Sequence, residues 1–230
     1  FVRHTIDTSL EGLTIVYDGA NGAASSVGPE ILSGLGAKVI NINVNPDGLN
    51  INHHCGSTHI EGLQVAVQQH NADLGIANDG DADRCLLVDE KGQVLDGDQI
   101  MLLCALKLKE EGKLKDDTVV GTVMSNIGFH KAAQELGMKT FATAVGDRYV
   151  LEYMREHNLS VGGEQSGHVI FLDHNTTGDG MLTAVQVAAL MKEKNQPLSE
   201  LAGIMTKYPQ VLINVRVATK TGWAVSYTHL

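Results

Sequence analysis

The chain has 230 residues, of which 43% are hydrophobic, so there is room for one large domain or two of roughly 100 to 130 residues each. Its 27 acidic and 17 basic residues give a net charge of −10, which argues against nucleic acid or an anionic membrane as the main partner. No apolar run approaches the ~20 residues of a membrane helix. Three scattered cysteines without a C-x-x-C pair indicate reduced thiols in a cytoplasmic protein.

Strands and helices are predicted to alternate through the first half of the chain. Strands are expected at 13–17, 38–44, 74–77, 85–88 and 93–95, and helices at 25–35, 60–70 and 99–111. The helix that starts at residue 99 follows Asp98, which is predicted to be its N-cap. The glycine-rich turn at 18–22 lacks the order of a nucleotide-phosphate loop, so we interpret it as close backbone packing near a site.

The second half repeats this alternation. Strands are expected at 118–124, 140–142 and 169–172, and helices at 127–136, 149–157 and 179–194. Strands that alternate with helices of this length are typical of βαβ units, with sites at the carboxyl ends of the strands. The sequence therefore predicts two similar α/β domains with mixed, mostly parallel sheets, separated near 112–117. A further strand is expected at 211–217, after which the pattern is lost.

Three carboxylates stand at every second position between the strands at 74–77 and 85–88. They are Asp79, Asp81 and Asp83, and Arg84 follows at once. Their mutual repulsion is relieved only if a positive group lies among them. A hard divalent cation with oxygen ligands is the natural occupant, and Mg²⁺ is favoured over Ca²⁺ if a phosphate completes the shell.

Two other interpretations of this acidic loop compete with a magnesium site. An EF-hand has the same spacing of acids, but Arg84 stands at its sixth position, where a Gly is needed for the turn, and the flanks are predicted strands. A merely solvated turn does not need three carboxylates on one side. The magnesium loop is the interpretation we carry forward.

A second loop gathers a carboxylate, a hydroxyl and an imidazole. Glu164, Ser166 and His168 alternate within a glycine-rich segment, so their side chains are expected to point one way if that segment is extended. Groups that both donate and accept suit a polyol such as a sugar. The alternative is a glycine-rich turn with a capping Ser.

Asp147 and Arg148 stand at a predicted helix start, where free backbone N–H groups favour an anion. Arg148 is a candidate bidentate ligand of a phosphate, and a plain salt bridge at the helix start is the alternative. His53, His54 and His59 with Cys55 match no zinc spacing, so structural hydrogen bonding is the favoured interpretation there.

Together the motifs resemble the α-D-phosphohexomutase superfamily. The resemblance to the superfamily is carried by Asp79 to Arg84 and by Gly163 to His168. A closer resemblance is to the bacterial branch that interconverts glucosamine 6-phosphate and glucosamine 1-phosphate, with phosphomannomutases and phosphoglucomutases as the alternative. Five segments carry it, at 46–52, 55–59, 123–128, 145–149 and 175–180, and the similarity runs from 11 to 217.

The resemblance implies an isomerase with four domains around a cleft, in which a phosphoserine and a bisphosphate intermediate exchange the phosphoryl group. Asp79, Asp81 and Asp83 would then bind Mg²⁺, and Arg84 would lie beside the transferring group. Glu164, Ser166 and His168 would bind sugar hydroxyls of a hexosamine phosphate, and Arg148 would face the cleft. These are the residues whose positions the structure must explain.

The resemblance also implies how the chain is divided. Residues 1–10 would be a remnant of domain 1, 11–112 the metal-binding domain 2, 113–208 the sugar-binding domain 3, and 209–230 the start of domain 4 with a tail unlike the family. The serine loop of domain 1 and the phosphate loop of domain 4 are not found, so these missing domains would be partners and the segment alone is expected to be inactive. A non-catalytic sugar-phosphate or metal-binding module is the second functional class, and a homo-oligomer is left open.

Overall fold

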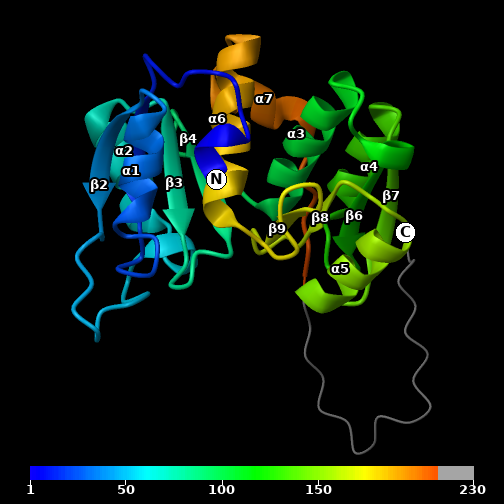
Figure 1. Cartoon of the computed structure of the whole chain (residues 1–230), viewed down its shortest axis with the longest axis horizontal. Coiled ribbons are helices and arrows are strands. Elements are labelled where there is room, and N and C mark those ends of the chain that lie inside the picture. The colour runs from blue at the N-terminus through cyan, green and yellow to red at the C-terminus, as the bar shows by residue number, and fades with distance from the viewer. Residues whose placement is uncertain (212–230) are drawn as a thin grey trace, which may run out of the picture.

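The computed structural model describes residues 1–211, and it contains two mixed sheets of the same topology (Figure 1). The strand order is β2-β1-β3-β4-β5 in the first sheet and β7-β6-β8-β9 in the second. β1 in the first sheet and β6 in the second are each parallel to two neighbours, and a hairpin then adds the antiparallel strand β4 or β9; the first sheet also has a fifth strand, β5, antiparallel to β4. The strands are β1 (Thr14–Asp18), β2 (Lys38–Ile42), β3 (Leu74–Asn78), β4 (Cys85–Asp89), β5 (Val94–Leu95), β6 (Thr118–Thr122), β7 (Lys139–Thr143), β8 (Val161–Gly163) and β9 (Val169–Phe171).

Seven α-helices and four short 3₁₀ turns connect these strands within residues 1–211. The helices are α1 (Val27–Gly34), α2 (Glu61–His70), α3 (Gly97–Glu110), α4 (Ile127–Glu135), α5 (Asp147–Glu156), α6 (Gly180–Lys194) and α7 (Leu198–Leu201). The 3₁₀ turns are η1 (Val2–His4), η2 (Gly56–Thr58), η3 (Lys115–Asp117) and η4 (Ala202–Ile204). The predicted fold class, two α/β domains with mixed sheets, is confirmed. The strand predicted at 211–217 lies, apart from its first residue, outside the described residues.

Helix starts follow the capping rules, with one correction. Asn126 and Asp179 accept hydrogen bonds from the first-turn amides of α4 and α6, because a short side-chain oxygen satisfies N–H groups that have no partner inside the helix. The predicted cap of α3 is wrong: Asp96, not Asp98, accepts from Gln99 N. Asp98 is fully buried and accepts instead from Asn126 N, at 2.7 Å, so it joins the starts of α3 and α4.

Two helices are exchanged between the units. α3 follows the first sheet in sequence but packs against β6 and β8 of the second sheet, as well as against β4. α6 follows the second sheet but packs against β3 and β4 of the first, and the two helices also contact each other. Figure 1 shows α6 between the two sheets. The domain limits predicted from the sequence stay a prediction, since sequence order and packing assign α3 differently.

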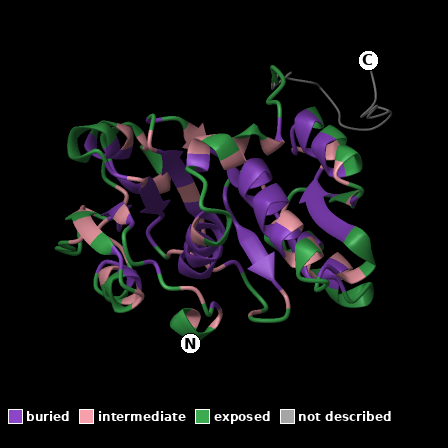
Figure 2. Cartoon of the chain, turned by 90° about the horizontal axis from the view of Figure 1, so that it is seen from above, coloured by how far each residue is buried: buried purple, intermediate pink, exposed green. Residues whose placement is uncertain are grey.

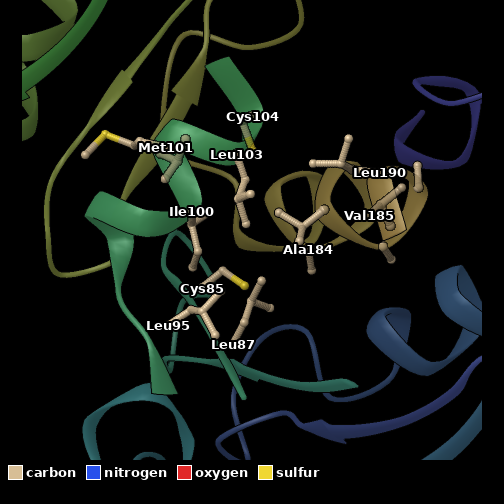
Figure 3. Packing of buried hydrophobic residues seen from close by; sticks show 14 of the residues in the cluster. Cys85, Leu87, Leu95, Ile100, Met101, Leu103, Cys104, Ala184, Val185 and Leu190 are labelled. Carbon is tan, nitrogen blue, oxygen red and sulfur yellow. The ribbon is translucent and has the colours of Figure 1, made fainter. Parts of the chain in front are cut away.

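The exchanged helices form the centre of one shared core. Ile100 and Leu103 of α3 lie close to Cys85 of β4 and Ala184 of α6 (Figure 3), and buried segments run through the middle of the molecule (Figure 2). Two smaller clusters lie on the outer faces, one under α2 and one under α5. Every residue of α6 from Gly180 to Met191 is buried, because the helix is covered both by the first sheet and by α3. Among the described residues, no helix combines the length and the hydrophobicity that crossing a bilayer would require.

Candidate functional site

The two hairpin loops, β3–β4 and β8–β9, meet at a backbone seam. Arg84 and His168 form an isolated antiparallel bridge, and Cys85 N donates to Gly167 O at 3.0 Å. Gly167 has a φ of +97°, and a Cβ at this position would overlap Cys85 O, so a glycine is required for the close approach. The acidic loop and the predicted sugar loop are therefore held edge to edge.

The acidic loop has the geometry of a cation site. Ligand oxygens of Asp79, Asp81 and Asp83 lie within 4.8 Å of one another, and theirs is the only such group of three found among residues 1–211. Burial, and then the charges of Asp83 and Asp81, raise the pKa of Asp79 to about 6, as expected where carboxylates crowd together in a protein interior. Asp83 Oδ1 is buried without a hydrogen-bond partner. An all-oxygen donor set with an unsatisfied carboxylate fits a hard divalent ion.

Buried polar side chains behind the loop hold its shape. Asn78 Nδ2 donates to Arg84 O at 2.7 Å, and Asn78 Oδ1 accepts from the Tyr17 hydroxyl at 3.0 Å. Arg84 N donates to Asp79 Oδ1 at 3.2 Å. Ala82 has a left-handed φ of +63°. Its carbonyl oxygen accepts a hydrogen bond from Gly180 N at 2.9 Å, which helps to hold this conformation. A non-glycine residue in this conformation is strained, and such strain is typical of functional loops.

Sequence reasoning missed Asp18, which fixes the turn that packs against the acidic loop. It is fully buried at the end of β1 and accepts from Ala20 N, Gly56 N and Asn43 Nδ2 at 2.9–3.0 Å. Burial raises its pKa, and these three hydrogen bonds oppose the rise. The turn that follows packs directly on the acidic loop, since Ala23 N donates to Gly80 O at 2.8 Å. The predicted backbone packing at 18–22 is confirmed.

The loop that carries Glu164, Ser166 and His168 is a turn, not an extended segment. Gly167 N donates to Glu164 O at 3.0 Å, so the expectation that alternation would align the three side chains is wrong. The turn still brings all three to one cavity. Glu164 Oε1 accepts from Gly146 N at 3.0 Å, and His168 Nε2 accepts from Gly178 N at 3.2 Å.

This cavity has a volume of about 630 Å³ and lies along the seam. It is lined by the end of the acidic loop, the ends of β6 and β7, the start of α5 and the β8–β9 turn. The lining residues are Asp83, Arg84, Thr122, Met124, Val145, Gly146, Asp147, Glu164, Gln165, Ser166 and His168. Five buried polar side-chain atoms lack a partner within residues 1–211, and three of them, Asp83 Oδ1, Arg84 Nε and His168 Nδ1, belong to this lining. Such a concentration indicates a site that binds a polar ligand.

Arg148 is not brought to this cavity. Its side chain is 81% exposed and its Nε lies 2.7 Å from Glu152 Oε1, one helical turn along α5. The predicted anion site at the start of α5 is occupied by the protein's own carboxylates, because Glu164 accepts from Gly146 N and Asp147 accepts from Arg148 N. The plain salt bridge, the alternative at this position, is the arrangement that forms.

The histidine cluster is not a metal site in this structure. The rings of His53, His54 and His59 lie in edge contacts, with centroids 4.4 and 5.4 Å apart. Their ring nitrogens do not converge with Cys55 into a ligand group, and among residues 1–211 only the acidic triad forms one. Hydrogen bonding, the favoured interpretation, is present at His59, whose Nδ1 lies 3.2 Å from Thr58 Oγ1.

Each sheet is covered by helices on both faces, so the chain contains two three-layered α/β/α units, and comparison with known proteins shows the family to which such units belong. Residues 3–92 match the family model of phosphoglucomutase/phosphomannomutase α/β/α domain II, and residues 96–208 match that of domain III. The chain belongs to the phosphoglucomutase/phosphomannomutase family.

Similar proteins agree with this assignment. The chain is 58% identical over 220 residues to the phosphoglucosamine mutase of Desulforamulus reducens, a match that covers 96% of this chain and 50% of the relative. A Burkholderia thailandensis protein of the phosphoglucomutase/phosphomannomutase family has the same fold, with a TM-score of 0.78 at 23% identity over 92% of this chain and 45% of its own. So has Aspergillus fumigatus N-acetylphosphoglucosamine mutase with GlcNAc-6P and magnesium, with a TM-score of 0.72 at 22% identity over 95% of this chain and 54% of its own. The chain spans about half the length of the curated relatives it matches.

Proposed function

We propose that this chain supplies the metal-binding and sugar-binding parts of an enzyme that interconverts glucosamine 6-phosphate and glucosamine 1-phosphate. The observation that supports the proposal is the seam between Arg84 and His168, at which Asp83 and Arg84 of the acidic loop and Glu164, Ser166 and His168 of the β8–β9 turn line one cavity. The name of the Desulforamulus relative supports the hexosamine substrate. Three free cysteines are consistent with a cytoplasmic protein.

Asp79, Asp81 and Asp83 would hold Mg²⁺ at the end of β3. When bound, the ion would neutralise charge on a transferring phosphoryl group, which is the main task of a protein in such reactions. Arg84 lines the cavity beside Asp83 with its side chain 43% exposed, although its Nε is buried and lies 3.8 Å from Asp79. Its guanidinium is therefore available to bind phosphoryl oxygens and to spread their negative charge.

Glu164, Ser166 and His168 would orient the sugar. Glu164 Oε1 is held by Gly146 N, which leaves its second oxygen to accept from a hydroxyl. Because a backbone N–H can only donate, the bond from Gly178 N makes His168 Nε2 an acceptor, so a neutral ring carries its proton on Nδ1. These groups hold the ring of the substrate while the phosphoryl group moves, and positioning of this kind supplies much of the rate.

We propose that the nucleophile, a phosphoserine, lies in a part of the protein beyond this sequence. It would donate its phosphoryl group to the free hydroxyl of the sugar phosphate, and the bisphosphate would then return the other phosphoryl group to the serine. On this proposal the 230-residue chain alone binds ligands but does not turn them over.

A chimera tests the proposal. Residues 3–208 of this chain would replace the matching domains of the Desulforamulus enzyme, and turnover would be measured with glucosamine, glucose and mannose phosphates. We expect the highest kcat/KM with glucosamine 6-phosphate, and a loss of several powers of ten on Asp81→Asn. A folded chimera that prefers glucose or mannose phosphate would establish the sibling activity instead. A folded chimera that binds sugar phosphate without turnover would support the non-catalytic module.

A further inference from the structure

Carboxylates outnumber basic groups in the cavity lining, which carries Asp83, Asp147 and Glu164 beside Arg84. The Arg84 Nε lies 3.8 Å from Asp79 and 3.9 Å from Asp83, and the Arg84 side chain is 43% exposed. A ligand that brings a positive group to Asp147 and Glu164, and a negative group to Arg84, matches this arrangement.

Asp147 has no lysine or arginine partner among residues 1–211. Its neighbour Arg148 is paired with Glu152, and the basic atom near its carboxylate is His168 Nε2, at 3.8 Å. That nitrogen already accepts a hydrogen bond from Gly178 N, so it has no proton to donate to Asp147. Asp83 Oδ2 lies 3.6 Å from the same nitrogen. Two carboxylates thus face a nitrogen that donates to neither, and a donor that reaches between them would satisfy both.

His168 is the second observation that points to a ligand. Its side chain is only 3% exposed, it lines the cavity, and its Nδ1–H has no hydrogen-bond acceptor, which a hydroxyl oxygen of a sugar ligand would supply. The start of α5 indicates the charge that such a ligand should carry at this wall of the cavity. The amide of Gly146, which would otherwise attract an anion, is taken by Glu164. An anion placed at this wall would meet two carboxylates, whereas an ammonium group would be attracted by both.

We propose that Asp147 recognises the ammonium group at C2 of a hexosamine phosphate, and so makes this site prefer hexosamine over hexose phosphates. This inference rests on the proposed function and names the residue that selects its substrate class. Asp147 is the residue to expect in this role, because its side chain is 60% exposed and Glu164 is already engaged by Gly146. A neutral C2 hydroxyl could still donate a hydrogen bond to Asp147, but it would lack the attraction between opposite charges.

The test is an NMR titration of the isotope-labelled 230-residue chain in excess Mg²⁺. Glucosamine 6-phosphate and glucose 6-phosphate would be compared, with the amides of Gly146, Asp147 and Gly167 as reporters. We expect the chain to bind the amino sugar about three- to tenfold more tightly, an effect kept modest by the exposure of the carboxylate. Asp147→Asn should bring the ratio close to one, chiefly by weakening the binding of the amino sugar, because the amide oxygen can still accept from a hydroxyl but lacks the negative charge.

Glu156→Gln is the matched control, since it removes a charge from an exposed position of α5 outside the cavity lining and should preserve the preference. The preference should also fade as the pH is raised past the pKa of the sugar amine, a response that a purely structural role for Asp147 would not produce. An unchanged ratio in Asp147→Asn, or equal binding by the unaltered chain, would overturn this inference alone. No shift at the three reporters with either sugar would overturn the proposed function together with it.

Discussion

The β3–β4 and β8–β9 hairpin loops occupy equivalent places in two sheets of the same topology, yet they are built differently. The acidic loop is held by buried polar side chains of its own sheet, because Asn78 donates to Arg84 O and accepts from the Tyr17 hydroxyl. The β8–β9 turn is open to the cavity and relies on helix starts, at Gly146 of α5 and Gly97 of α3. Crowded carboxylates need rigid support, whereas groups that bind hydroxyls need access.

The exchanged helices tie the two loops together. Gly97 at the start of α3 donates its N–H to Gln165 O, and Gly180 at the start of α6 donates its N–H to Ala82 O, both at 2.9 Å. Each loop is thus contacted by a helix that follows the other unit's sheet in sequence. Because each loop is contacted by a helix of the other unit, one topology used twice holds two kinds of chemistry next to each other. It also shows that the chemistry is decided by the residues grafted onto the fold and not by the fold itself.

The largest effect is expected from substitutions that disrupt the contacts between the helix starts and the two loops. A Cβ at Gly180 would overlap Asn78 Nδ2 and Arg84 O, and one at Gly97 would overlap Glu164 O. Backbone atoms cannot give way as a flexible side chain can, so we expect Gly180→Ala and Gly97→Ala each to lower the free energy of unfolding by ~3 kcal/mol or more. Urea denaturation measures the loss.

Gly62→Ala is the control for these two substitutions. Gly62 lies within α2 and a Cβ there would meet nothing within 4 Å, so alanine should raise the free energy of unfolding by up to ~1 kcal/mol. If Gly97→Ala proved as stable as the unaltered protein, the close contact between the start of α3 and the β8–β9 turn would not be needed for stability.

The next comparison is between the buried carboxylates of the two units. Asp18 has three hydrogen-bond donors, whereas Asp98 accepts from Asn126 N and has an unsatisfied Oδ1. Burial raises the pKa of Asp98 to about 6. A raised carboxyl pKa contributes stability that is present below the ordinary value near 4 and is lost as the pH rises through 6, up to ~3 kcal/mol in all.

Asp98→Asn should remove this part of the pH dependence, because the amide oxygen can still accept from Asn126 N but does not titrate. The free energy of unfolding of the variant, measured from pH 4 to pH 7, should decline less than that of the unaltered protein. Parallel curves for the two proteins would show that Asp98 titrates normally.

A third prediction separates the metal loop from the sugar loop. Mg²⁺ should raise the thermal midpoint of the chain at millimolar but not at nanomolar concentrations, since a ligand that binds only the folded state stabilises it. Asp79→Asn should abolish that rise and should itself increase stability without metal by ~1 kcal/mol, as one of three repelling charges is lost. Ser166→Ala should leave the response to Mg²⁺ unaltered. Tight binding of Ca²⁺ would instead favour the EF-hand interpretation.

The smallest effect is expected at Arg148, which lies outside the cavity and should contribute little to stability or ligand binding. Its ion pair with Glu152 is fully solvent-exposed on both sides, with exposures of 81% and 56%, and such pairs contribute little to folding. Arg148→Ala should leave the thermal midpoint and the binding of glucosamine 6-phosphate to this chain nearly unchanged. A tenfold loss of binding would show that Arg148 reaches the cavity when the ligand is present, as the family resemblance implies.

Much of the local structure was predictable because it depends on neighbours in sequence. The caps at Asn126 and Asp179, and the strands on either side of the acidic loop, follow from short-range rules of hydrogen bonding and hydrophobic pattern. The errors have the same origin. Asp98 was predicted to be a cap because the capping rule takes only the next few residues into account. Its actual hydrogen-bond donor, Asn126 N, lies 28 positions away in the sequence.

The α/β class, the acidic triad and the set of polar groups in the β8–β9 loop follow from the amino-acid pattern, because spacing within a few residues is enough to define them. No local pattern shows that the two loops share one cavity, that α3 and α6 change places, that the turn after Asp18 packs on the acidic loop or that Arg148 lies outside the cavity. These facts depend on contacts between segments far apart in the chain. Such contacts arise from the burial of a common core and the satisfaction of buried polar groups, and neither is encoded in any local pattern.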